Sequence, residues 1–164
     1  MIKIIGICFT LIVLLLGCKQ SCINSSVKPV FVGFAPSDID TLVIRAYKAN
    51  DNFVHLIDTM LIVSAGPALY DTSGDTTVVD VGGTSDGSGD PRYNIVAGYD
   101  WQIYIPALNR TITLSQIISP QTEHAGRICW NPIKSFVLDG QFIVPELAET
   151  NKWYTSGYRA YIQY

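Results

Sequence analysis

Alternating apolar and polar residues mark one β-hairpin in this chain, and a two-residue turn signal between two short apolar runs marks another. The first has the arms 101–105 and 111–114, in which apolar side chains recur at every second position, and a five-residue connection joins them. The second has the arms 135–138 and 141–144, joined by Asp139-Gly140, a strong signal for a two-residue hairpin turn. Because a period of two puts apolar side chains on one face of a strand, the first hairpin is expected to bury one face.

Other short runs rich in β-branched and aromatic residues are separated by turn residues. They predict strands at 30–34, 42–47, 53–63, 76–81 and 158–164, with Asn50-Asp51-Asn52 as the turn before the third of these. Only Pro145 to Lys152 is predicted as a helix, of one or two turns, because proline is favoured in a first turn. Eight or nine short strands without a long helix are typical of an all-β protein. We expect an antiparallel β-sandwich, immunoglobulin-like or transthyretin-like in outline, with at most one short helix.

The N-terminus has a different pattern from the rest of the chain. Lys3 precedes an almost wholly apolar run from Ile4 to Leu16, and Leu15-Leu16-Gly17-Cys18 ends it. Thirteen apolar residues are too few for a membrane span, which needs about 20. A charged start, a short apolar run and small residues at a cleavage point are typical of a secretory signal.

Leu15-Leu16-Gly17-Cys18 resembles the lipobox of bacterial lipoproteins. The resemblance covers only this leader, and it implies that the leader is cut before Cys18 and that the sulfur of Cys18 carries diacylglycerol. An ordinary secretory signal with a chance cysteine is the alternative. In that family an aspartate after the cysteine favours the inner membrane, and Lys19 stands there instead. The resemblance therefore implies lipid anchoring in a bacterial envelope, at the outer membrane.

These observations divide the chain into three parts. They are a signal peptide at 1–17, a lipidated N-terminus with a polar tether at 18–28, and a β-sandwich domain at 29–164. The body looks like the small β-domain lipoproteins of unknown role found in bacterial envelopes.

Composition excludes two classes of protein. A nucleic-acid binder needs excess positive charge to neutralise phosphates, and this chain has 11 Lys and Arg against 14 Asp and Glu. A disordered chain lacks apolar residues, and here 48% of the residues are hydrophobic. No nucleic-acid partner is expected.

The chain has four cysteines, of which Cys8 lies in the leader and Cys18 is the lipidation site. The remaining two, Cys22 and Cys129, are a candidate disulfide, since disulfides persist in an oxidising compartment. Such a bridge closes a loop of roughly 100 residues and stabilises by about 4–5 kcal/mol in the chain-entropy model. Two unrelated thiols are the alternative, because pairing cannot be deduced from sequence.

Three further patterns bear on chemistry. Gly83-Thr84-Ser85-Asp86-Gly87 matches the nucleophile elbow of serine hydrolases, but Ser88-Gly89-Asp90-Pro91 cannot begin the helix that this elbow needs. Asp86 and Asp90 are weak candidates for calcium ligands, without the spacing of an EF-hand, so no metal or other cofactor is expected. His55 is expected as a structural histidine on a strand face with Phe53 and Ile57. With His124 in a distant polar loop, it forms no acid–base pair.

The C-terminal part is rich in aromatic residues, which stack on sugars and also anchor protein interfaces. Trp153, Tyr154 and Tyr158 are therefore candidate ligand-binding residues. Taken together, the sequence favours a lipid-anchored, non-enzymatic envelope protein that acts as an interaction or structural module. Its expected partners are the membrane and another envelope protein. A carbohydrate-binding lipoprotein is the alternative, with a glycan as its partner, and a serine hydrolase is a remote one.

Overall fold

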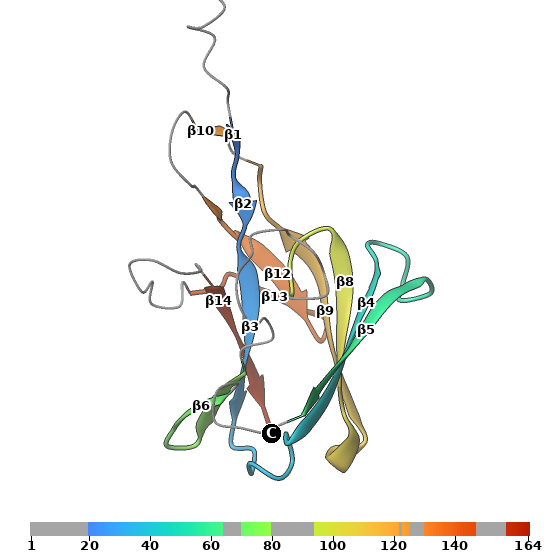
Figure 1. Cartoon of the computed structure of the whole chain (residues 1–164), viewed down its shortest axis with the longest axis vertical. Coiled ribbons are helices and arrows are strands. Elements are labelled where there is room, and N and C mark those ends of the chain that lie inside the picture. Colours follow the sequence, from blue (N-terminus) through green and yellow to red (C-terminus); the bar gives the residue numbers. More distant parts are fainter. Residues whose placement is uncertain (1–19, 64–69, 80–93, 122, 125–129, 147–156) are drawn as a thin grey trace, which may run out of the picture.

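The computed structural model describes residues 20–63, 70–79, 94–121, 123–124, 130–146 and 157–164. These residues form an all-β structure in which two sheets pack face to face (Figure 1). The antiparallel β-sandwich predicted from the short alternating strands is confirmed. Among the described residues the sole helical segment is a 3-10 turn at Pro106–Leu108.

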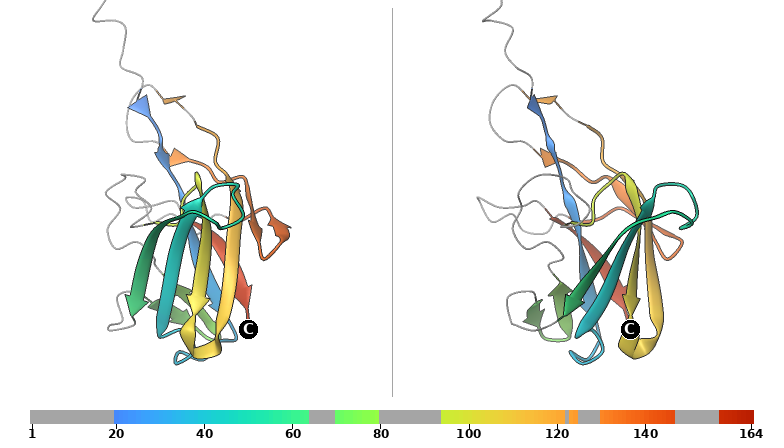
Figure 2. Two further views of the ribbon diagram at one scale, coloured as in Figure 1. Left: turned by 90° about the vertical axis from the view of Figure 1, so that its right-hand side faces the viewer. Right: turned by 45° about the vertical axis from the view of Figure 1, so that its right-hand side comes forward.

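The larger sheet has six strands in the order β13-β12-β9-β8-β4-β5, and every neighbouring pair in it is antiparallel. Figure 2 shows β5 at one edge of this sheet and the β12–β13 hairpin at the other. The strands are β4 (Thr41–Lys48), β5 (Leu56–Val63), β8 (Tyr99–Ile105), β9 (Arg110–Ile118), β12 (Ser135–Leu138) and β13 (Gln141–Ile143).

The smaller sheet has four strands in the order β14-β3-β7-β6. The N-terminal and C-terminal strands of the domain, β3 and β14, lie side by side in parallel over seven residue pairs, which the expectation of antiparallel pairing did not include. The strands are β3 (Ser26–Val32), β6 (Tyr70–Ser73), β7 (Thr76–Val79) and β14 (Gly157–Gln163).

Local turn chemistry explains the hairpins that the sequence predicted. Asp139 and Gly140 have φ values of 47° and 81°, as a type I′ turn requires at both central residues. Asn109, at φ 47°, ends the 3-10 turn that connects β8 to β9.

Two predictions differ from the structure. The strand expected from residue 53 begins at Leu56. The helix expected at 145–152 is not seen at Pro145 and Glu146, and its other residues lie outside the described ones.

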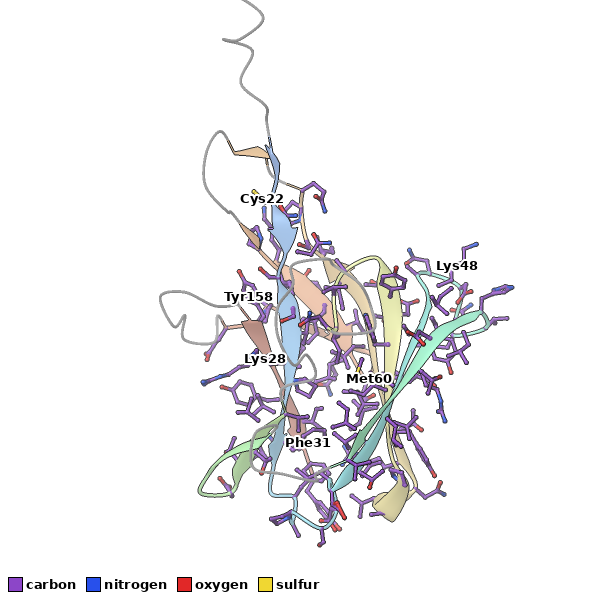
Figure 3. All side chains as sticks on the ribbon, in the orientation of Figure 1. Cys22, Lys28, Phe31, Lys48, Met60 and Tyr158 are labelled. Atoms are coloured by element: carbon purple, nitrogen blue, oxygen red, sulfur yellow. The ribbon has the colours of Figure 1, made fainter. Side chains whose placement is uncertain are left out.

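The core lies between the two sheets. Phe31 projects from the smaller sheet, and Trp101 and Phe136 from the larger one, and all three are at most 1% exposed (Figure 3). The indole N–H of Trp101 donates a hydrogen bond of 2.9 Å to the backbone oxygen of Val96, so this buried polar group is satisfied.

The N-terminal strand continues beyond the sandwich as a paired segment that we call the neck. Gln20–Ser21 (β1) pairs with Glu123–His124 (β10), and Ile23–Asn24 (β2) pairs in parallel with Trp130–Asn131 (β11). The neck comprises residues 20–25, 121, 123–124 and 130–131, and Figure 1 shows it rising from the end of β3. A polar tether was expected at 18–28, but its described part is in paired strands over most of its length.

A buried amide cluster holds the neck together. The side chain of Asn131 is fully buried, and its Nδ2 donates to the backbone oxygen of Cys22 at 3.0 Å, to Oδ1 of Asn24 at 2.9 Å and to Oε1 of Gln121 at 3.1 Å. Two N–H bonds thus serve three acceptors, so one of them is shared. Gln121 also donates from Nε2 to Asn24 Oδ1 at 3.0 Å. These contacts join the N-terminal strand to residues about 100 positions away in the sequence.

A disulfide adds a covalent link in the neck. Cys22 is 7% exposed and disulfide-bonded, and Figure 3 shows it above the body of the sandwich. Cys129, the candidate partner, lies outside the described residues. Cys129 precedes Trp130 in the sequence as Cys22 precedes Ile23, and Trp130 pairs with Ile23 in a parallel register. The Cys22–Cys129 pairing stays a prediction, with this register in its favour.

Replacing Asn131 tests the amide cluster. Asn131→Ala removes the shared donor and takes from the backbone oxygen of the buried Cys22 its hydrogen bond to that amide, so we expect a loss of about 1–3 kcal/mol in the free energy of unfolding. Denaturant titration measures this loss. Gln163→Ala, at an exposed position of β14, is the control and should stay within about 0.5 kcal/mol of the parent chain. An equal effect of the two substitutions would contradict the structural role of the cluster.

Mass spectrometry of a non-reduced digest tests the disulfide pairing. We expect one linked peptide pair that contains Cys22 and Cys129 and disappears on reduction. Reduction should also lower the free energy of unfolding by about 2–5 kcal/mol, and Cys129→Ser should have the same effect. A link from Cys22 to another cysteine would overturn the pairing.

Candidate functional site

Strand β5 is the most unusual surface feature of the described residues. It forms the end of the six-stranded sheet, with β4 on one side and no described strand on the other. An edge strand exposes unpaired backbone N–H and C=O groups, and proteins usually protect such edges with charges, prolines, bulges or short length. β5 is eight residues long, Asp58 is its one charged residue, and its pairing with β4 shifts register between Leu56 and Asp58. The run Thr59–Val63, beyond that shift, is regularly paired and uncharged, so this part of the edge can accept an added strand.

Both faces of β5 carry apolar side chains. Leu61 and Val63 are 63% and 47% exposed, and they pair with Val43 and Thr41 on the outer face of the sheet. Met60 and Ile62 alternate with them and point toward the core, as Figure 3 shows for Met60. A partner strand placed beside β5 would thus meet apolar side chains on both faces.

The loop that precedes β5 has a strained backbone. Asn50, Asn52 and Phe53 have φ values of 60°, 56° and 60°, in the left-handed region that bulky residues such as phenylalanine rarely enter. Each such residue costs on the order of 1 kcal/mol or more, so other contacts must hold the loop. The ring of Phe53 packs edge-on against Tyr47, with centroids 5.5 Å apart. The N–H of Lys48 donates to the backbone oxygen of His55 at 2.9 Å.

Asp51 organises this loop from within. Its carboxylate accepts backbone hydrogen bonds from Val54 at 3.3 Å and from His55 at 3.2 Å, and Nδ1 of His55 lies 2.7 Å from it. Desolvation acts to raise the pKa of Asp51. The side-chain and backbone hydrogen bonds from His55 and Val54 outweigh that effect, so the pKa lies below its usual value. The expectation that His55 lies on a strand face was wrong, because its side chain is 69% exposed in the loop.

The loop therefore presents apolar side chains to solvent in a fixed arrangement. Val54 is 70% exposed, and Leu56 and Ile57, at the beginning of β5, are 52% and 53% exposed. Phe53 is partly exposed beside them. We call residues 53–57 the apolar tip. It is continuous with the β5 edge, and together they form the candidate interaction site.

The outer face of the larger sheet is occupied by short polar contacts. The guanidinium of Arg45 lies 5.6 Å from the ring centroid of Tyr104, and the hydroxyl of Tyr47 donates to Oε1 of Gln102 at 3.0 Å. Within the described residues, no group of three or more His, Cys, Asp or Glu side chains is placed to hold a metal ion. No helix in that same part of the chain is long and apolar enough to cross a membrane.

Most residues that the sequence singled out lie outside the described residues. This group holds the lipidation site, the disulfide candidate Cys129, the serine-hydrolase pattern with its two aspartates, and two aromatic candidates: Cys18, Cys129, Ser85, Asp86, Asp90, Trp153 and Tyr154. Tyr158 is described, and it is partly buried and packs against the core. His55 and His124 lie apart, in the loop before β5 and in the neck.

Sequence reasoning did not identify the β5 edge. Apolar and polar residues do not alternate regularly in the segment 56–63. This irregularity could have indicated a strand with exposed apolar side chains. Its place at the edge depends on the strand order, which involves residues far apart in sequence.

Comparison of the chain with protein-family models, with curated proteins and with solved structures found no match.

Proposed function

We propose that this protein is a lipid-anchored, non-enzymatic component of a bacterial envelope that works by contact through the edge strand β5. The observation that carries the proposal is the apolar, regularly paired run Thr59–Val63 at the edge of the described six-stranded sheet. Edge strands of this kind bind extended segments of other proteins by adding a strand, with main-chain hydrogen bonds for affinity and side-chain contacts for specificity.

The neck supports the anchored arrangement. Cys18, the proposed lipid attachment site, stands two residues before Gln20, where the first described strand begins. Pairing with β10 and β11, the amide cluster and the disulfide of Cys22 hold this segment to the domain. A disulfide also fits a protein that is exported to an oxidising compartment. An anchor at Cys18 would thus be coupled to the sandwich through the paired strands of the neck.

The site accounts for partner binding better than for catalysis. Burying exposed leucine and valine side chains releases about 25 cal/mol per Å² of apolar surface, and backbone pairing along β5 aligns the partner. Of the three aromatic candidates for glycan binding, Tyr158 is the one that the structure describes, and it packs against the core.

Substitution of the proposed lipidation site tests the anchor. In a bacterial host with lipoprotein processing, the parent chain should lose residues 1–17 and carry acyl mass on the N-terminal Cys18. Cys18→Ser should leave the chain without acyl groups and release it from the membrane fraction. Mass spectrometry of the N-terminal peptide and membrane flotation measure these results. An unacylated Cys18 in the membrane-bound parent chain would overturn the proposal.

A charge placed on β5 tests the contact edge. Leu61→Lys puts an ammonium group where a partner strand would desolvate it, so we expect at least a tenfold loss of cross-linked partner, or about 1.4 kcal/mol. Quantitative mass spectrometry of cross-links formed in native membranes measures the loss. Thr111→Lys, on the same outer face but in β9, is the matched control and should retain the partner. Equal cross-linking in both variants would contradict the role of β5.

A further inference from the structure

The apolar tip lies at the same end of the sandwich as the neck. β3 runs from the neck to the opposite end, and β4 returns, so the loop between β4 and β5 is brought back to the neck end (Figures 1 and 2). The residue pairs Lys48–Tyr99 and Ile105–Arg110 place the 3-10 turn at the far end of the same sheet. The apolar tip therefore lies at the neck end of the sandwich, to the side of the neck, which extends beyond it (Figure 1).

We propose that the apolar tip, residues 53–57, docks into the surface of the membrane that carries the lipid anchor. The inference rests on the proposed anchor at Cys18. Since Gln20 begins the neck two residues after Cys18, an anchored membrane must lie at the neck end of the molecule. Because Cys18 and Gln20 are two residues apart in the sequence, a sandwich that leans toward the anchored membrane brings the apolar tip to the lipid, which makes a second point of attachment.

The chemistry of the tip suits the boundary between headgroups and acyl chains. Val54, Leu56 and Ile57 are each more than half exposed, and apolar groups at an interface bury about 5–10 Å deep. The charge of Asp51 is engaged by hydrogen bonds from Val54 and His55, so it is not presented bare to lipid phosphates. Lys48, exposed at the end of β4, stands beside the loop and can meet those phosphates (Figure 3).

The strained backbone is a second, independent observation. Asn50, Asn52 and Phe53 have positive φ, and the edge-on contact of Phe53 with Tyr47 leaves the other apolar side chains of the tip more than half exposed. Such strain is typical of binding loops whose conformation is fixed in advance. A rigid tip loses little conformational entropy on docking, because its backbone is already ordered.

A depth measurement tests the proposal in the full lipidated chain. Cys22 is disulfide-bonded and Cys18 is expected to be acylated, so Val54→Cys offers a free thiol for an environment-sensitive fluorophore. The parent chain should take up no label, as a check. Vesicles of phosphatidylethanolamine and phosphatidylglycerol with a nitroxide near the headgroup supply the quencher. Ala107→Cys, exposed in the 3-10 turn at the far end, is the matched control.

We expect lipid quenching of the label at position 54 to exceed that at position 107 at least threefold. Ile57→Asp, added to the Val54→Cys chain, should abolish this excess, because a carboxylate is costly in the interface. Since Ile57 is exposed, the melting temperature should change little.

The outcomes separate the docking from the anchor. Chains that float with the vesicles but show equal quenching at positions 54 and 107 overturn the docking and leave the anchor intact. Chains that do not float overturn the anchor, and the docking with it. Protection of position 54 from water in native membranes, without lipid quenching, assigns the tip to a protein partner and also overturns the proposal.

Discussion

The structure depends on a single long N-terminal strand that is held on both sides. Within the sandwich, β3 pairs with β14 on one side and β7 on the other, and Phe31 projects from it into the core. Beyond the sandwich, the same strand continues into the neck, where backbone pairing, the buried Asn131 amide and the Cys22 disulfide hold it. Any force applied at the N-terminus is therefore transmitted directly to the core.

Local chemistry made the hairpins of the larger sheet predictable. Asp139-Gly140 specifies its turn because both residues tolerate positive φ, and the alternation around Trp101 reports a strand with one buried face. The neck was not predictable in this way. Its strands are only two residues long and pair with residues about 100 positions away, so no local period marks them. The parallel pairing of β14 with β3 likewise joins residues far apart in the sequence, so local patterns do not predict it.

The candidate site was also predicted only in part from the sequence. Phe53 and Val54 extend the apolar run of β5, so the sequence predicted one strand from residue 53. The hydrogen bonds that Asp51 accepts from Val54 and His55 stop that strand and turn its first residues into a loop. The exposure of Leu61 and Val63 depends on the strand order. In a central strand, these side chains would contact side chains of the two adjacent strands, whereas β5 has a described neighbour on one side only. Sequence therefore identified the strand but not its exposure.

The proposed anchor, the apolar tip and the β5 edge form a consistent arrangement in space. Leu56 lies at the neck end of β5 and Val63 at the far end, so the strand leads away from an anchored membrane. Two attachment points, one through lipid and one through the tip, would fix the direction of this edge, whereas a lipid on a free tether would leave it random. A fixed edge favours capture of an extended partner segment, because less rotational freedom is lost when the partner strand adds. In this arrangement the paired neck would serve the function, because it holds the strand that leads to the anchor against the domain.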